Sequence, residues 1–296
     1  MKHITVLKHE AVAGLALTPS SVVVDATLGA GGHAALILEA LGDTGRFIGL
    51  DADHTAIDAL AHLQDSKADV QLRVQNFSKL DTVLSDIGID KVDAILADLG
   101  WRTDQFTDGN KGFSFGADEP LYMTYGEPSS YPFTAADIVN SWDEENIATV
   151  IYSYGEERYS RQIAAKIIEV RRKTRITSAK QLADIIASAV PAGYRNGRIN
   201  PATKSFQGLR IAVNDEFGVL ETFISSAWTH LKHNGRLAII TFHSLEDRIV
   251  KHRFKALAAN DQGVLITKKP IVPTREEVNA NPRSRSAKLR IIQKIS

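Results

Sequence analysis

The stretch "DATLGAGGHAALIL", residues 25–38, places three glycines within four positions, at Gly29, Gly31 and Gly32. The apolar run before them, residues 21–27, is typical of a buried strand, and residues 33–42 have apolar positions at helical spacing and end in glycine. A strand, a glycine-rich turn and a helix N-terminus bring backbone N–H groups close to a ligand. We therefore expect a ligand-binding turn here. A tight turn without a ligand is the alternative.

The pattern around this turn continues along the chain. Residues 45–53, 70–76 and 92–100 are also typical of short buried strands, and a helical pattern lies between the first two strands and between the second and third. This βαβαβ order predicts an α/β fold with a parallel sheet and right-handed crossovers.

Three of the four expected strands end in an acid, including Asp51 and Asp98. Asp51 follows Gly29 by 22 residues, the spacing at which an acidic side chain accepts hydrogen bonds from ribose hydroxyls. Asp98 is expected at the same carboxyl edge, where its carboxylate can orient an amine. Because "GAGGH" lacks the third glycine of the dinucleotide fingerprint, an adenosine ligand without pyrophosphate fits better than a nicotinamide or flavin dinucleotide.

The acid-x-x-aromatic spacing of Asp98 and Trp101 suits methyl transfer to an amino group. The acid accepts the N–H, and the aromatic ring gives a base a surface on which to stack. The alternative is that Asp98 caps a turn while Trp101 belongs to the core.

After Gly100 the pattern changes. Residues 101–134 have no period, and three helical stretches follow at 134–142, 145–173 and 178–190. The α/β pattern then resumes with one long helix over 200–232, a strand at 235–244, a helix at 245–257 and strands at 263–270 and 287–295. We therefore expect an α/β domain formed by 1–105 and 200–296, with a mainly helical domain, 106–199, inserted into it.

Composition excludes several classes of function. The chain has 296 residues and no cysteine, which rules out disulfides, thiolate metal sites and cysteine nucleophiles. Its nine histidines show no metal-ligand spacing, so we expect no metal. No apolar run is long enough to span a membrane, and the first residues lack a signal-peptide pattern, so we expect a cytoplasmic protein.

The zero net charge hides an uneven distribution. Residues 1–150 contain 9 Lys and Arg against 23 Asp and Glu, and residues 151–296 contain 26 against 12. Basic runs such as "RRKTR" (171–175) favour a surface that neutralises phosphates. The alternative is that they are solvated helix faces paired with the acids of the other half.

Eight motifs occur in order along the chain: "DATLGAGGH", "NFSKL", "DLG", "GFSF", "YGEER", "INPATKSFQGLRIAVNDE", "TFHSLEDRIVK" and "NPRSRSAKLRI". Together they resemble the ribosomal RNA small-subunit methyltransferase H family, the cytosine-N4 methyltransferases of 16S ribosomal RNA. The resemblance implies a class I (Rossmann-like) fold for 1–105 and 200–296, with S-adenosylmethionine as the methyl donor. It also implies that the helical domain inserted after the fourth strand, 106–199, recognises the RNA. It also implies small-subunit ribosomal RNA or the assembled small subunit as partner, and a homodimer is compatible with it.

The resemblance also assigns residues. The family's cofactor contacts fall on Gly31, Gly32, His33, Asp51, Phe77, Asp98 and Gln105, with Asp98 and Trp101 nearest the chemistry. A target cytosine must leave its stack and lie between flat side chains, for which Trp101, Phe113 and Phe115 are candidates. The further candidates for RNA contact are Arg171, Arg172, Lys173, Lys204, His243 and Ser244.

Some of these motifs have structural alternatives. In "HSLEDR", Ser244 and Asp247 have the spacing of a helix capping box. "YGEER" (154–158) suits a helix surface with a charge pair as well as it suits a phosphate clamp.

The chain departs from the family in two segments, 101–107 and 121–126, where Tyr122, Thr124 and Gly126 replace two acids and an arginine. Two alternatives therefore stay open. One is a methyltransferase with a different acceptor or, less favoured, a nicotinamide-dependent oxidoreductase. The other is an RNA-binding ribosome-assembly factor with lost or altered activity.

Overall fold

The computed structural model describes residues 4–99, 110–116 and 118–295. The chain forms two compact units: unit 1 comprises residues 1–100 and 217–296, and unit 2 comprises residues 101–216. The sequence predicts the second boundary at 199/200, but helix α11 (Ala202–Asn214) belongs to unit 2. The reason is its packing on α7 (Glu144–Gly155), where Gly155 and Gly208 let the two backbones approach closely.

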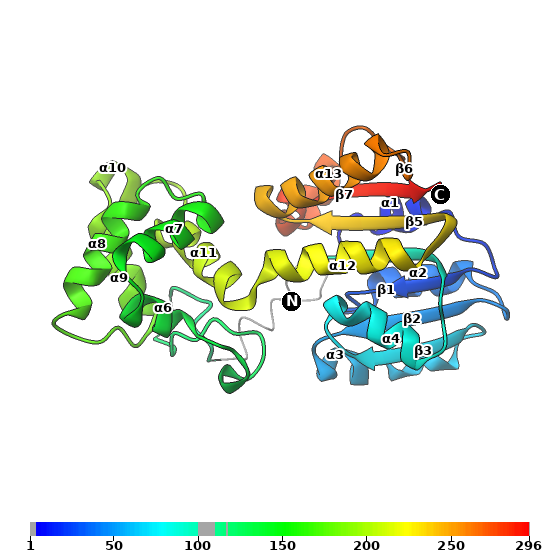
Figure 1. Cartoon of the computed structure of the whole chain (residues 1–296), viewed down its shortest axis with the longest axis horizontal. Coiled ribbons are helices and arrows are strands. Elements are labelled where there is room, and N and C mark those ends of the chain that lie inside the picture. Colours follow the sequence, from blue (N-terminus) through cyan, green and yellow to red (C-terminus); the bar gives the residue numbers. More distant parts are fainter. Residues whose placement is uncertain (1–3, 100–109, 117, 296) are drawn as a thin grey trace. The chain divides into compact units, whose positions relative to one another are not determined.

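Unit 1 contains a seven-stranded sheet of order β3-β2-β1-β4-β5-β7-β6 (Figure 1). The strands are β1 (Val22–Asp25), β2 (Arg46–Asp51), β3 (Asp69–Val74), β4 (Val92–Asp98), β5 (Leu231–Thr241), β6 (Gly263–Leu265) and β7 (Lys288–Lys294). The first five strands are parallel, and β7 runs antiparallel to β5 and β6. This confirms the expected α/β class and is the strand arrangement of the class I methyltransferase sheet.

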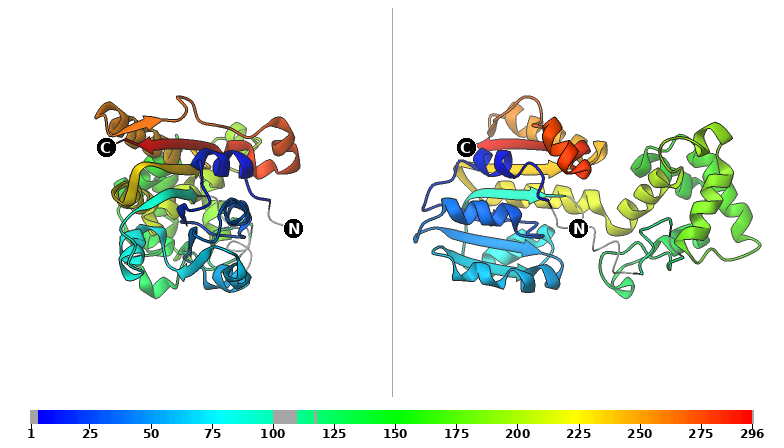
Figure 2. Two further views of the ribbon diagram at one scale, coloured as in Figure 1. Left: turned by 90° about the vertical axis from the view of Figure 1, so that its right-hand side faces the viewer. Right: turned by 180° about the vertical axis from the view of Figure 1, so that it is seen from behind.

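Helices cover both faces of this sheet, and two buried clusters fill the space between (Figure 2). The helices of one face are α1 (Lys8–Leu15), α2 (Gly32–Ala40) and α3 (His54–Ala59), and those of the other are α4 (Leu80–Asp86), α12 (Glu216–His230) and α13 (Ser244–Ala259). The connections include η1 (Ala61–Asp65), η2 (Phe77–Lys79), α14 (Arg275–Ala280) and η4 (Pro282–Ser286). Both faces of the central strands are therefore buried, as their continuous apolar runs predict.

The register of the sheet decides where the functional side chains lie. In β1, Asp25 is paired with Gly49 of β2 and with Leu96 of β4. Because β1, β2 and β4 are parallel neighbours, their carboxyl ends lie at one edge of the sheet. Asp25, Asp51 and Asp98 therefore project at this edge.

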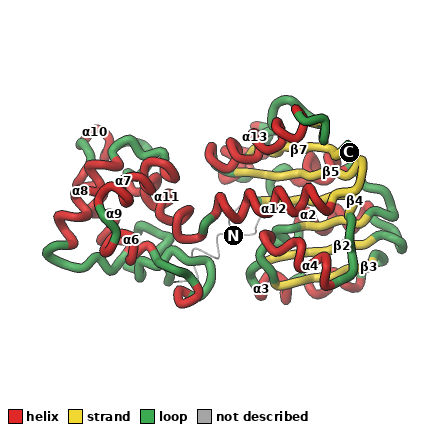
Figure 3. The backbone as a smooth tube through the Cα atoms, in the orientation of Figure 1, coloured by secondary structure: helices red, strands yellow, loops and turns green. Residues whose placement is uncertain are grey.

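Unit 2 is helical apart from its loops (Figure 3). The helices among its described residues are η3 (Pro128–Ser130), α6 (Ala135–Ser141), α7, α8 (Ser160–Arg171), α9 (Ala179–Ala189), α10 (Ala192–Arg195) and α11. A buried cluster from α6, α7, α8, α9 and α11 forms a core of its own, which includes Ile138, Ile151 and Leu182. An inserted helical domain is thus present.

Two patterns that predict single long helices are each broken by one residue in the left-handed region. Glu156, with φ of 52°, ends α7 before α8, and Asp215, with φ of 46°, ends α11 before α12. At the first break Glu157 is buried and accepts hydrogen bonds from the backbone N–H of Tyr159 (2.8 Å) and the hydroxyl of Tyr194 (2.5 Å). "YGEER" is therefore a turn held by a buried carboxylate.

The charge difference between the halves of the chain does not follow the two units. Unit 2 has 14 Lys and Arg against 15 Asp and Glu, yet residues 158–210 alone have 12 against 2. The excess of basic residues therefore lies in the second part of unit 2 and also in residues 217–296 of unit 1, which have 14 Lys and Arg against 6 Asp and Glu. Within the described ranges, no helix has the length and apolar character needed to cross a membrane.

Candidate functional site

The glycine-rich turn is fixed to the neighbouring strand. The backbone N–H of Leu28 donates to the carbonyl of Leu50, and that of Gly29 donates to Oδ2 of Asp51, both at 2.8 Å. Asp51 also accepts the backbone N–H of Asp53 through Oδ1 at 2.9 Å. Asp51 therefore shapes the turn at the edge where the ribose contact is expected.

The glycines meet different requirements. Gly29 and Gly31 have φ of 53° and 76°, a region that favours glycine. A Cβ on Gly31 would collide with Leu60, and one on Gly32 would collide with Thr5. A Cβ on Gly29 would meet only the carbonyl of Thr27, at 3.7 Å. Close packing of the chain on itself thus explains two glycines, and the open space lies over Gly29.

Asp98 and His33 lie together at the end of β4. The backbone N–H of Asp98 donates to Oγ1 of Thr27 at 2.6 Å. Oδ2 of Asp98 lies 3.9 Å from Nδ1 of His33, which is buried. Nε2 of His33 lies 3.1 Å from the carbonyl of Val6, which can only accept, so this nitrogen has the proton. The expected cofactor neighbours His33, Asp51 and Asp98 are therefore brought to one edge.

Asp25 is a third carboxylate at this edge to which the sequence analysis assigned no role. It is 1% exposed, and its Oδ2 has no hydrogen-bond partner among residues 4–99, 110–116 and 118–295. Burial is the main cause that raises the pKa of Asp25 to about 7. The hydrogen bond from the Thr27 N–H opposes this rise, and the charges of Asp98 and Asp51 add to it. The rule that singled out Asp51 and Asp98, an acid at a strand end, applies equally to Asp25.

The remaining cofactor candidates are divided by what the structure describes. Phe77 is half-buried in η2 after β3, and its ring packs edge-on against Phe223 with centroids 5.2 Å apart. The side chain of Asn76 caps this turn by accepting the N–H of Ser78 at 2.9 Å. Trp101 and Gln105 lie outside the described residues.

The aromatic candidates for base stacking have protein partners in unit 2. Phe113 is stacked on Tyr125, with centroids 5.6 Å apart and ring planes 13° apart, and Phe115 packs edge-on against Phe206 at 5.9 Å. Both rings pack against the helical core. They remain predictions for base contact, with a packing role that the sequence did not reveal.

Two of the basic candidates also have structural partners. Arg171 donates through one guanidinium nitrogen to the carbonyls of Val139 (3.0 Å) and Trp142 (2.6 Å) at the end of α6. Lys204 donates to the carbonyl of Glu156 at 3.0 Å and so satisfies the end of α7. Arg172 and Lys173, in contrast, are exposed.

"HSLEDR" contains a capping box, one residue earlier than predicted. His243 rather than Ser244 is the N-cap of α13, and Glu246 rather than Asp247 completes the box. Asp247 instead forms ion pairs with Arg290 (2.7 Å) and Lys288 (3.1 Å), which join α13 to β7. Burial alone would raise the pKa of Asp247, but hydrogen bonds from both cations outweigh it and lower the pKa.

The divergent segment 121–126 is packed into unit 2. Thr124 is fully buried and donates to the carbonyl of Gly126 at 3.0 Å, so this position suits a small polar residue. Asn214 accepts the N–H of Tyr125 and donates to the carbonyl of Met123. In the motif "RIAVNDE", Asn214 therefore fixes the backbone of the segment 121–126.

The sheet order, with a glycine turn and three carboxylates at one edge, agrees with the class I methyltransferase fold that the sequence predicts. The chain belongs to the MraW methylase family, whose model matches residues 1–295. It is 46% identical over 301 residues to the ribosomal RNA small subunit methyltransferase H of Synechococcus elongatus, covering 99% of this chain and 95% of that protein. The protein of the same name from Trichodesmium erythraeum is 44% identical with full coverage of both chains, and that from Brevibacillus brevis is 41% identical with 99% and 98% coverage.

Proposed function

We propose that this protein transfers a methyl group from S-adenosylmethionine to N4 of a cytidine in small-subunit (16S) ribosomal RNA. The observation that carries the proposal is the full-length similarity to proteins named ribosomal RNA small subunit methyltransferase H, at 41–46% identity. Its partner is ribosomal RNA or the assembled small subunit, and its place of action is the cytoplasm.

We call the edge formed by the glycine turn, Asp25, Asp51 and Asp98 the cradle. The negative charge of the cradle suits this donor. S-adenosylmethionine supplies a methyl group on a positively charged sulfonium centre. Asp25, Asp51 and Asp98 lie close enough that the charges of two of them raise the pKa of the third. A site with several carboxylates favours a cationic ligand and disfavours a pyrophosphate. The electrostatics therefore support a sulfonium donor over a dinucleotide.

In this proposal each residue has a distinct task. Asp51 accepts the ribose hydroxyls and fixes the turn, and Phe77 lies against the adenine ring. Asp98 accepts a hydrogen bond from an N–H of the cytosine amine. When this hydrogen bond forms, less of the nitrogen lone pair is drawn into the ring. Since the transfer is a single displacement, catalysis rests on positioning and electrostatics. The ring of His33 lies beside Asp98, with Nδ1 3.9 Å from Oδ2, and the carbonyl of Val6 fixes the orientation of this ring.

The test is to incubate the full chain with methyl-labelled donor and unmodified small-subunit ribosomal RNA, either naked or in assembled subunits. Digestion to nucleosides and mass spectrometry should find the label in N4-methylcytidine. Label in another nucleoside would show a different acceptor. Donor binding without any transfer would contradict the enzyme and favour the assembly factor.

A further inference from the structure

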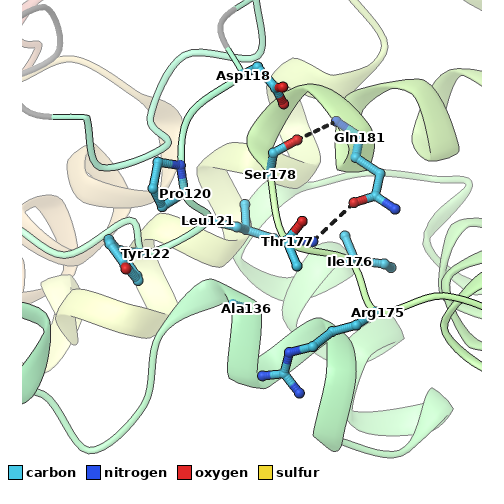
Figure 4. A pocket seen from close by; sticks show the side chains of 10 residues that line it. All are labelled: Asp118, Pro120, Leu121, Tyr122, Ala136, Arg175, Ile176, Thr177, Ser178 and Gln181. Atoms are coloured by element: carbon cyan, nitrogen blue, oxygen red, sulfur yellow. Dashed lines mark hydrogen bonds between the residues drawn. The ribbon is translucent and has the colours of Figure 1, made fainter.

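Unit 2 has a pocket of its own, formed by residues 118–122, α6 and the segment leading into α9 (Figure 4). Its volume is about 730 Å³, within the range of small-molecule sites of about 300–1,000 Å³. Backbone hydrogen bonds hold its two sides together, from Leu121 N–H to the carbonyl of Thr177 (3.2 Å) and from Ala179 N–H to the carbonyl of Glu119 (2.9 Å). The pocket is therefore formed before any ligand binds.

Opposite charges line this pocket. Arg175 and Asp118 are both exposed, and neither makes an ion pair or side-chain hydrogen bond to another described residue. Figure 4 shows Asp118 and Arg175 at opposite ends of the lining. The nearby acid of α6, Asp137, forms the capping box with Thr134, and the charge of Arg175 is the smallest of the causes that lower its pKa. Arg175 is near Asp137 without forming an ion pair with it, so its exposed guanidinium and the carboxylate of Asp118 can both meet a ligand.

The remaining lining offers a flat surface and a donor. The side chain of Tyr122 lies on the opposite side of the pocket from Gln181 (Figure 4). Tyr122 is 37% exposed. Oε1 of Gln181 accepts the N–H of Thr177 at 3.0 Å, which fixes the amide and leaves its Nε2 as a hydrogen-bond donor. Tyr122 stands in the segment 121–126, which departs from the family pattern in the sequence.

We propose that this pocket binds one unpaired nucleotide of the RNA substrate. The proposal rests on the proposed function and adds a second recognition site to it. Arg175 pairs with the phosphate, the ring of Tyr122 stacks on the base, and Asp118 accepts the exocyclic amine of the base. The carboxylate repels phosphate, so the nucleotide can enter in one direction only. An acidic peptide fits less well because its charges would meet Asp118.

The base preference follows from Asp118. Cytosine has an amine at position 4, where uracil has a carbonyl that a carboxylate repels. The full chain should therefore bind fluorescein-labelled hexacytidylate more tightly than hexauridylate in an anisotropy titration. Asp118→Asn should bring the two affinities together, because a carboxamide can also donate.

Variants of the other two residues test the remaining contacts. Tyr122→Ala should weaken binding of both hexamers about tenfold, while Tyr122→Phe should retain it, because stacking needs only the ring. Arg175→Gln should weaken both equally and reduce the salt slope by about 0.7. Arg161→Gln, which removes an exposed cation of α8 outside the pocket, is the matched control and should change binding less than twofold.

Unchanged affinities in all three pocket variants, or equal losses in Arg175→Gln and Arg161→Gln, would overturn the proposal. Thermal melting confirms that each variant is folded. In methyl transfer to ribosomal RNA, Tyr122→Ala should raise KM and leave kcat within twofold. A wild-type protein that makes no N4-methylcytidine but keeps the hexamer pattern would overturn the proposed function alone. Full transfer with an unchanged KM in the variant would overturn the pocket alone.

Discussion

The two units differ in how closely sequence position determines a residue's task. In unit 1, Asp25, Asp51 and Asp98 end parallel neighbouring strands, so the topology itself brings them together. In unit 2, Arg171 and Lys204 have basic side chains that suit RNA, yet both hold carbonyl groups at helix ends. A residue at a strand end is placed by the sheet, whereas a surface cation is placed by local contacts that the sequence does not display.

The largest expected effect is the loss of chemistry in unit 1. Asp98→Asn keeps the shape of the side chain but removes the charge that we propose acts on the cytosine amine. We expect kcat for methyl transfer to fall about 100-fold or more, with RNA affinity unchanged. Labelled-donor assays and RNA titrations measure the two. The control is Asp69→Asn, which should keep full activity. Asp69 is the first residue of β3 and therefore lies at the other edge of the sheet, away from the carboxyl ends of the strands. Equal losses in both variants would contradict the assignment of Asp98.

The next largest effect concerns an acid of unit 1 with a purely structural task. Asp247→Ala leaves Arg290, whose side chain is 12% exposed, without its partner and should cost about 3 kcal/mol of unfolding free energy. Because the pKa of Asp247 is lowered in the fold, its contribution is present above the ordinary pKa and is lost as the pH falls. Urea unfolding at several pH values measures it.

The matched control for this prediction is Asp69→Ala. It breaks an ion pair with Arg46 in which both side chains are more than 40% exposed. This loss should stay below about 1 kcal/mol. If Asp247→Ala lowers the unfolding free energy no more than the control does, the ion pairs of Asp247 do not stabilise the contact between α13 and β7.

Asp25 sharpens the comparison because it is ionisable, buried and part of the cradle. Its folded pKa of about 7 lies above the ordinary 3.8, so the folded chain binds the proton more tightly than the unfolded chain. Stability should therefore fall as the pH rises from about 4 to about 7 and then level off. Asp25→Asn should remove this slope and add about 4 kcal/mol of unfolding free energy at pH 8. A variant that keeps the wild-type pH slope would show that another group causes it.

The smallest effect separates two neighbours in the basic run of unit 2. Arg171→Gln should cost about 1 kcal/mol of stability, because the carbonyls of Val139 and Trp142 lose their donor, with little change in RNA binding. Arg172→Gln, at an exposed position, should leave stability unchanged and reduce the salt slope of RNA binding. The reverse outcome would restore Arg171 as an RNA contact.

The fold was largely predictable because its periodicities are strong. The strand and helix order of unit 1, the inserted helical part and the shared edge of Asp51 and Asp98 all follow from apolar runs and strand ends. The breaks at Glu156 and Asp215 were missed, because the residue with positive φ at each break is an acid rather than the glycine that usually takes this conformation at a helix end. The packing of Thr5 on Gly32 and the bond from His33 to Val6 were also missed. They join segments that are distant in sequence, without a local pattern.

The central claim is that the strand ends of unit 1 form a cradle for the sulfonium donor, and calorimetric titration of the full chain with S-adenosylmethionine tests it most directly. The account predicts one site per chain, binding weakened about tenfold or more in Asp51→Ala and unchanged binding in Asp69→Asn. Absence of binding by the wild-type chain, or equal affinity in wild type and Asp51→Ala, would contradict it.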